Sequence, residues 1–130
     1  RVVLVDSRAA ELAQARNGVE TRLTPLPEAE IAQAPPGTVF VVTTHDHGLD
    51  FLLTLAALKR GDAAYVGLIG SATKRARFTR FAEEHGTSDL HALTCPIGAA
   101  GLGDKRPEVI ALMTAQEIFT AFARANPEAP

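Results

Sequence analysis

Short apolar runs and amphipathic stretches alternate along most of the chain. The apolar runs are continuous, with no polar residue at every second position, which is typical of strands covered by helices on both faces. The alternation of strands with helices therefore predicts an α/β fold with a doubly wound, mostly parallel sheet. We expect strands over 2–5, 19–23, 38–43 and 64–69, and helices over 9–16, 28–33, 49–60, 72–85 and 107–124.

The first expected strand ends at Asp6. In dinucleotide-binding folds an acidic residue at such a strand end binds a ribose hydroxyl, about 20 residues after a glycine-rich first turn. That turn and the central strand before it would precede Arg1, so these residues alone cannot build the complete sheet. Because the chain opens inside a strand without a methionine, we expect one domain, 1–130, from the C-terminal part of a longer protein. Alternatively, Asp6 is a turn or cap residue of the following helix.

The segment 65–78 runs from an apolar strand through Gly67 and Gly70 into a helix that begins near Ser71. Glycines allow close approach of a ligand, and the N–H groups of a helix N-terminus attract phosphate or carboxylate. Lys74 and Arg75 in the first turn oppose the helix dipole, so we expect a negative group to compensate them. The alternative is a tight turn with solvated cations. A Ser-x-x-Lys hydrolase motif over 71–74 is less favoured, because its companion motifs are missing.

Helical periodicity places Lys74 on the same side as Phe78, which belongs to the inward stripe. We therefore expect its ammonium group near Gly70 and Ser71. The loops that follow the parallel strands should share the carboxyl edge of the sheet with Asp6, where ligands of such folds bind.

A polar cluster over 43–50 follows the third expected strand. Within it, His45 and Asp46 are the better candidates for ligand contact, whereas Asp50 also suits a structural role in the first turn of a helix. Zinc binding is the weaker interpretation. The spacing resembles a binuclear metallohydrolase motif only superficially, because Phe51 stands where a histidine belongs.

A third cluster contains Cys95, Pro96, Ile97 and Gly98, and a glycine-bearing loop leads from it to the last helix. Cys95 is either a buried small apolar residue or a thiol activated by Lys74 or Arg75. We expect the last helix to bury its apolar side chains in the core: Val109, Ile110, Leu112, Met113, Ile118, Phe119 and Phe122.

Composition narrows the functional classes. The 130 residues have a net charge of −2, which argues against a nucleic-acid partner. We find no apolar run of about 18 residues and no basic-then-apolar leader, so we expect neither a membrane span nor a signal peptide. The single cysteine excludes an internal disulfide framework and suits the cytoplasm.

Three parts of the sequence, taken in chain order, resemble the C-terminal Rossmann-type domain of the XdhC/CoxI family. They are the polar cluster over 43–50, the glycine-bearing segment 65–78 and the cluster over 95–98. These proteins are accessory factors of xanthine dehydrogenase and related molybdenum hydroxylases. The resemblance extends from about Val2 to Phe122. The sequence departs from the family pattern at two places. After Gly98 the family usually has a bulkier residue followed by an acidic residue or proline. Before Pro107 the sequence has Arg106, where a small hydroxyl residue would cap the helix better. The family's glycine-rich turn and N-terminal domain are not in this sequence.

The resemblance implies a non-catalytic factor that binds the molybdenum cofactor (molybdopterin), helps to sulfurate it and inserts it into a client such as xanthine dehydrogenase. It also suggests a cysteine desulfurase as partner. The matching positions are His45, Asp46, Asp50, Gly67, Gly70, Ser71, Lys74, Arg75, Pro96, Ile97 and Gly98.

Two other functions stay open. The domain could be an NAD(P)- or flavin-binding oxidoreductase that holds the ribose with Asp6. It could also be an interaction module, with a shallow rim and an apolar patch beside it. A homodimer that pairs through the gap in the sheet is a further expectation.

Overall fold

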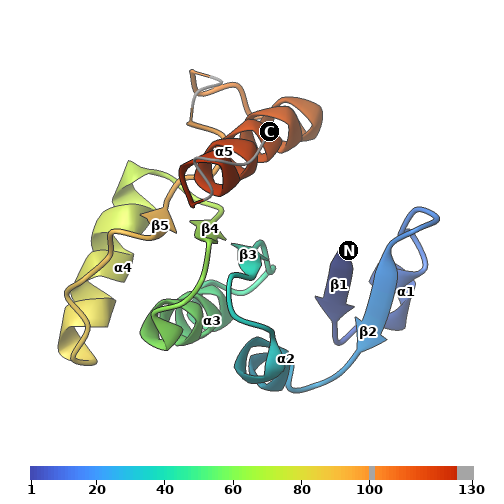
Figure 1. The fold of residues 1–130 in the computed structure, drawn as a ribbon, viewed down its shortest axis with the longest axis horizontal. Helices are drawn as coiled ribbons and strands as arrows, with labels where there is room; N and C mark the ends of the chain where they lie inside the picture. Colours follow the sequence, from blue (N-terminus) through green and yellow to red (C-terminus); the bar gives the residue numbers. More distant parts are fainter. Residues whose placement is uncertain (100–101, 126–130) are drawn as a thin grey trace. The chain divides into compact units, whose positions relative to one another are not determined.

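The computed structural model describes residues 1–99 and 102–125 (Figure 1). The chain divides into two compact units, Arg1–Ala34 and Pro35–Pro130, and each contains its own parallel sheet. No strand joins the two sheets within the described residues.

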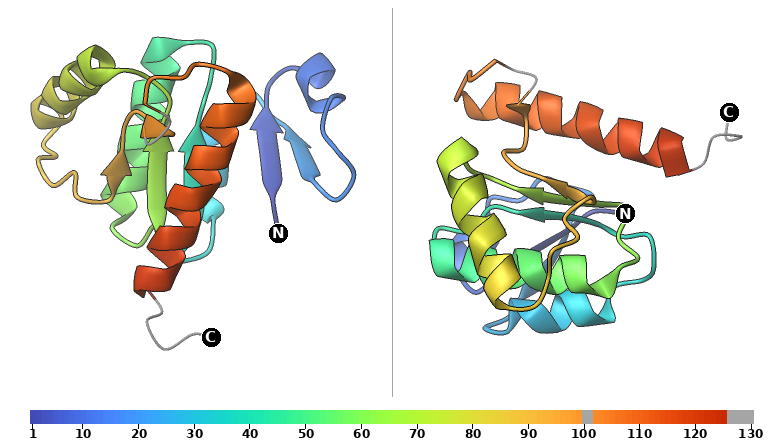
Figure 2. Two further views of the ribbon diagram at one scale, coloured as in Figure 1. Left: turned by 90° about the horizontal axis from the view of Figure 1, so that it is seen from above. Right: turned by 90° about the vertical axis from the view of Figure 1, so that its left-hand side faces the viewer.

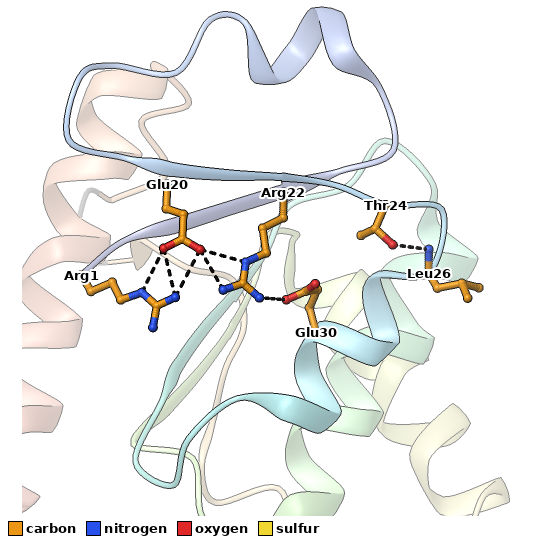
Figure 3. Close-up of polar contacts among 6 residues, drawn as sticks. All are labelled: Arg1, Glu20, Arg22, Thr24, Leu26 and Glu30. Carbon is orange, nitrogen blue, oxygen red and sulfur yellow. Dashed lines mark hydrogen bonds and ion pairs between the residues drawn. The ribbon is translucent and has the colours of Figure 1, made fainter.

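The first unit contains β1 (Val3–Asp6), α1 (Ala9–Leu12), β2 (Glu20–Leu23) and α2 (Pro27–Gln33). The two strands are parallel, with Val3 opposite Glu20. A chain of ion pairs connects residues on one side of this unit (Figure 3). Arg1 and Arg22 both bind the carboxylate of Glu20, and Arg22 also contacts Glu30 of α2 at 2.7 Å. These contacts tie α2 to β2 across exposed or partly exposed surface.

Helix α1 is shorter than the predicted helix over 9–16, and the chain continues in turns after Leu12. The prediction was wrong at this end because the segment buries no side chain within the structure. The N-cap residue, Arg8, also makes no side-chain capping hydrogen bond. A short helix without a packed face gains little stability in water.

The second unit contains β3 (Val39–Val42), α3 (His47–Arg60), β4 (Tyr65–Leu68), α4 (Ala72–Glu84), β5 (Leu93–Thr94) and α5 (Pro107–Ala125). Its strands are parallel in the order β3-β4-β5. Helices α3 and α4 lie on one face of this sheet and α5 lies on the other (Figure 2). The predicted α/β class with parallel strands and helices on both faces is confirmed.

The core of the second unit lies around its middle strand. All four residues of β4 are buried because the strand has neighbours on both edges and helices on both faces. Phe78 of α4 is fully buried and packs edge-on against Phe51 of α3, with ring centroids 5.4 Å apart. These aromatic contacts hold α3 and α4 against each other and thereby position the loops at their N-termini.

Beyond shifts of a single residue at element ends, the second unit differs from the prediction at the start of α3 and in a strand that was missed. Helix α3 begins at His47 and not at residue 49, because the side chain of Asp46 caps it by accepting a hydrogen bond from Leu49 N. Strand β5 was missed because it has two residues only, and its apolar signal is correspondingly weak.

The predicted burial of α5 is wrong for three residues. Leu112, Phe119 and Phe122 are 63%, 74% and 46% exposed. The helix carries apolar side chains around much of its circumference, but only one side can face the sheet of its own unit. Among the described helices, α5 included, none has the length and apolar character needed to cross a membrane.

Candidate ligand-binding site

The loops that follow β3, β4 and β5 meet at the carboxyl edge of the sheet. Two backbone hydrogen bonds join them, from Ile69 N to Val42 O and from Ile97 N to Leu68 O, each 3.1 Å long. Within the second unit, the predicted meeting of the loops after β3 and β4 is therefore confirmed, and the loop after β5, a strand that the sequence did not predict, lies beside them. We call this region the carboxyl edge. Asp6, which the sequence analysis also expected at this edge, belongs to the first unit.

A buried ion pair connects two of these loops. The ammonium nitrogen of Lys74 lies 2.7 Å from Oδ2 of Asp50, and the other carboxylate oxygen accepts a hydrogen bond from Thr44 N at 2.8 Å. The side chain of Asp50 is 0% exposed and that of Lys74 is 11% exposed. One carboxylate in the first turn of α3 thus fixes both the end of the β3 loop and the first turn of α4.

This pair changes the interpretation of Lys74. The side chain points inward toward Gly70, as predicted, but the negative group beside it is Asp50. Gly70 itself makes room for this lysine, because an added Cβ would lie 2.8 Å from Cδ of Lys74. Asp50 and Gly70 therefore have structural roles that require no ligand.

The N-terminus of α4 offers donors for an anion. Ser71 is the N-cap residue, and its hydroxyl accepts a hydrogen bond from Lys74 N. The N–H of Arg75 donates to Ser71 O. Ala72 and Thr73 are exposed, and N–H groups at these first two helical positions have no acceptor within a helix. Two backbone donors are therefore free of helical acceptors at the terminus where the sequence predicts an anion site.

The cluster after β3 is used mainly for helix capping. The N–H groups of Leu49 and Gly48 hold the pKa of Asp46 below its usual value, and the nearby His45 and His47 act in the same direction. His45 is exposed at the same loop. No three His, Cys, Asp or Glu side chains come together in a metal-binding arrangement within residues 1–99 and 102–125.

Arg75 and Cys95 are brought together, as the thiol hypothesis required. Nη1 of Arg75 donates to the backbone oxygen of Cys95 at 3.0 Å. Burial nevertheless raises the pKa of the Cys95 thiol, and this outweighs the lowering by Arg75 and Lys74. The cations therefore do not produce a low-pKa thiol here. The following residue, Pro96, is joined to Cys95 by a cis peptide bond.

Gly67 and Gly98 pack against the protein's own side chains. A Cβ on Gly67 would lie 2.5 Å from Cε1 of Tyr65 and 2.7 Å from Cγ2 of Ile97. Gly98 has a φ of 73°, and an added Cβ would lie 3.1 Å from the backbone of Ile110. Both glycines therefore allow close packing at this edge of the sheet.

Sequence reasoning missed Glu117 of α5. Its carboxylate accepts hydrogen bonds from the hydroxyl of Tyr65 at 2.9 Å and from Gly98 N at 3.1 Å. Burial, followed by this carboxylate, raises the pKa of Tyr65 well above its usual range. The available signal was that Glu117 is the one acidic residue between 109 and 125, in a largely apolar stretch.

A groove of about 560 Å³ lies between α5 and the ends of the strands. Its walls are almost entirely apolar. They include Thr43, Ile69 and Ile97 from the carboxyl edge, Ile110 and Ala115 from α5, and Lys105 from the preceding loop. We call this space the edge groove. The sequence did not predict it, because its two sides are far apart in the chain.

In the first unit, the carboxylate of Asp6 is bound by Arg8. It accepts hydrogen bonds from the backbone N–H of Arg8 at 2.9 Å and from its guanidinium group at 3.1 and 3.2 Å. The Arg8 guanidinium is the main reason that the pKa of Asp6 lies below its usual value. The turn interpretation of Asp6 therefore accounts for its contacts within this unit.

These features define a Rossmann-type α/β domain whose candidate ligand site lies at the carboxyl ends of parallel strands. Residues 1–118 match the XdhC Rossmann domain family, and the chain belongs to that family. Among curated proteins, none matches the chain.

Proposed function

We propose that this domain is part of an accessory protein that binds the molybdenum cofactor, helps to sulfurate it and inserts it into xanthine dehydrogenase or a related molybdenum hydroxylase. Membership in the XdhC Rossmann domain family over residues 1–118 carries this proposal. The arrangement of the carboxyl edge supports a binding role, because three loops converge where ligands of parallel α/β sheets usually lie.

The residues at the N-terminus of α4 fit the phosphate of such a cofactor. Ala72 and Thr73 present N–H groups at the positive end of a 13-residue helix, and Ser71 lies beside them. When bound, the cofactor would supply the molybdenum and its dithiolene sulfur atoms. The chain would bind and orient its phosphate. Cys95 is too buried to take part without a change in its loop.

A charge placed at this helix terminus tests the proposal. Ala72→Glu should stabilise or preserve α4, because a carboxylate suits the first turn, while repelling a bound phosphate. We expect the intact protein to lose most of its cofactor, measured as molybdenum content and pterin fluorescence after purification. Ala76→Glu, exposed one turn further along the same helix, is the matched control and should retain the cofactor.

Lys74→Ala is a poorer test, because removing Lys74 leaves Asp50 buried without its cation. Loss of cofactor in that variant could follow from loss of fold. Equal cofactor retention by Ala72→Glu and wild type would contradict a phosphate site at α4.

A second candidate function is that of an interaction module for the client enzyme. The exposed side chains of Leu112 and Phe119 on α5 support it, because exposed apolar patches often mark protein contacts. Phe119→Ser should then weaken client association without changing cofactor retention. Pull-down of the purified client together with a cofactor assay would separate the two functions.

The dinucleotide alternative depends on Asp6. Its carboxylate is already bound by Arg8, so a ribose hydroxyl would have to share or replace that contact. Fluorescence titration of the intact protein with NAD(P)H would detect such binding.

A further inference from the structure

The loop after β5, residues 95–98, is largely buried although it forms only bends and turns. Cys95, Ile97 and Gly98 are all buried. The backbone N–H and C=O groups of such a loop are shielded from water and have no strand or helix partner of their own, so other parts of the protein must supply partners. The backbone of β4 supplies one, because Ile97 N donates to Leu68 O.

Two charged side chains bind the same loop from opposite faces of the sheet. Nη1 of Arg75, in the first turn of α4, donates to Cys95 O at 3.0 Å. The carboxylate of Glu117, on α5, accepts from Gly98 N at 3.1 Å to Oε2 and 3.2 Å to Oε1. Because α4 and α5 cover different faces of the sheet, the loop connects the two helices (Figure 2).

Arg75 differs from Lys74 in its partners. The sequence predicts a negative group beside both cations, and Asp50 pairs with Lys74 at 2.7 Å. No Asp or Glu within residues 1–99 and 102–125 forms an ion pair with Arg75. A guanidinium group has five N–H donors, so those that do not bind Cys95 O are available to an anion at the start of α4. The direction of this group depends on the position of Cys95 O, and therefore on the loop.

We infer that Glu117 is a positioning residue for the ligand site at α4. Its carboxylate holds Gly98, the loop carries this constraint to Cys95 O, and Cys95 O fixes the guanidinium group of Arg75. A carboxylate suits this role, because hydrogen bonds to an ionised acceptor are stronger than those between neutral groups. The effect of Glu117 on ligand binding rests on the proposed function, whereas its effect on the loop does not.

Cys95 reports whether the loop is held. It is the single cysteine of the sequence, and it is 5% exposed, so its thiol should react only when the loop opens. Labelling of the intact protein with N-ethylmaleimide, followed by mass spectrometry of the peptide that contains Cys95, measures this opening. Glu117→Ala should raise the labelling rate by about tenfold or more, because it removes a charged acceptor. The same variant should lose most of its bound cofactor, measured as molybdenum content and pterin fluorescence.

Tyr65→Phe separates the loop from the docking of α5. It removes the other hydrogen bond of the same carboxylate, from the hydroxyl of Tyr65, and leaves the contact with Gly98. Its Cys95 should therefore be labelled at the wild-type rate. Gln116→Ala, at an exposed position of α5, is a second control, because this side chain binds Thr120 of its own helix.

Circular dichroism checks that each variant is folded. If Glu117→Ala does not fold, Glu117→Gln takes its place. Glutamine keeps one acceptor oxygen, so we expect a smaller rise in the labelling rate, about threefold, and partial retention of the cofactor.

A double variant tests the route through Arg75. Arg75→Ala should release the cofactor faster than wild type, followed as pterin fluorescence in the filtrate. Because Glu117 acts through Arg75, combining Arg75→Ala with Glu117→Ala should add no further acceleration. Arg77→Ala removes an exposed cation of the same helix and should release the cofactor like wild type.

Three results would overturn the inference. The first is an unchanged labelling rate in Glu117→Ala. The second is an equal rise in Tyr65→Phe, which would mean that the carboxylate supports the docking of α5 and not the loop. The third is faster cofactor release in the double variant than in Arg75→Ala. A wild-type protein without any cofactor would instead contradict the proposed function, and the labelling rates would still decide whether Glu117 holds the loop.

Discussion

The two units of the chain contain ion pairs of equal length in different surroundings. Arg22 and Glu30 of the first unit approach to 2.7 Å, as do Lys74 and Asp50 of the second. The first pair belongs to a surface network in which each partner is at least one quarter exposed (Figure 3). The second pair is enclosed between two helices and a strand end.

The distance between the charged atoms therefore does not measure how much an ion pair contributes to the stability of the folded protein. Water and salt screen the surface network, and ordering its long side chains costs entropy. The buried pair is different, because removing one partner leaves a charge without solvent. The cluster that suggests ligand binding in the sequence thus also contains the contact whose loss should destabilise the second unit most. The following predictions test the difference between the two pairs, from the largest expected effect to the smallest.

Lys74→Met should have the largest effect. It leaves the carboxylate of Asp50 buried without a cation, and we expect the free energy of unfolding to fall by about 3–5 kcal/mol. Urea denaturation followed by circular dichroism would measure it. The double variant Asp50→Leu with Lys74→Met should recover most of the loss, apart from the cost of the unpaired N–H of Thr44. A loss in the single variant no larger than that of a surface substitution would contradict the role of this pair.

Gly67→Ala should have an intermediate effect. The added methyl group would overlap the ring of Tyr65 and the side chain of Ile97, and moving them would disturb the hydrogen bond to Glu117. We expect a loss of about 1–3 kcal/mol in the free energy of unfolding. Gly48→Ala is the control, because its added Cβ meets only Oδ1 of Asp46, at 3.2 Å. Equal stability of the two variants would show that the close packing at Gly67 is unimportant.

Asp46→Asn should change the pH dependence of stability. The pKa of Asp46 is lower in the folded protein, so its carboxylate contributes stability above its unfolded pKa of about 4. That contribution is lost as the pH falls through the lowered folded value. Asparagine also caps helices but does not titrate in this range. The difference in unfolding midpoint between neutral and acidic urea titrations should therefore be smaller in the variant, and an identical difference would exclude this role.

Glu20→Gln should have the smallest effect. It removes the carboxylate that Arg1 and Arg22 share, yet Arg1 can return to solvent and Arg22 keeps its contact with Glu30. We expect no resolved change in the denaturation midpoint of the intact protein, at low or high salt. A large destabilisation would mean that this network holds the first unit together.

Local patterns predicted much of the fold and part of the site. The apolar runs located β1 to β4 because buried parallel strands need continuous apolar residues. Gly70, Ser71 and Lys74 correctly marked the start of α4 and the inward direction of the lysine. The exposed positions of Leu112 and Phe119 could not be predicted, because helical periodicity does not show how many sides of an apolar helix are covered.

The sequence by itself determined the order of the elements apart from β5, the parallel class of the sheet and the resemblance to the XdhC family. These depend on local periodicity and on short motifs. Only the tertiary structure decided that Asp50 is the partner of Lys74, that Glu117 caps the loop at Gly98, and that open space lies beside α5. Asp50 and Lys74 are 24 positions apart in the chain, and Gly98 and Glu117 are 19 positions apart. Contacts between such distant positions are selected by packing in three dimensions.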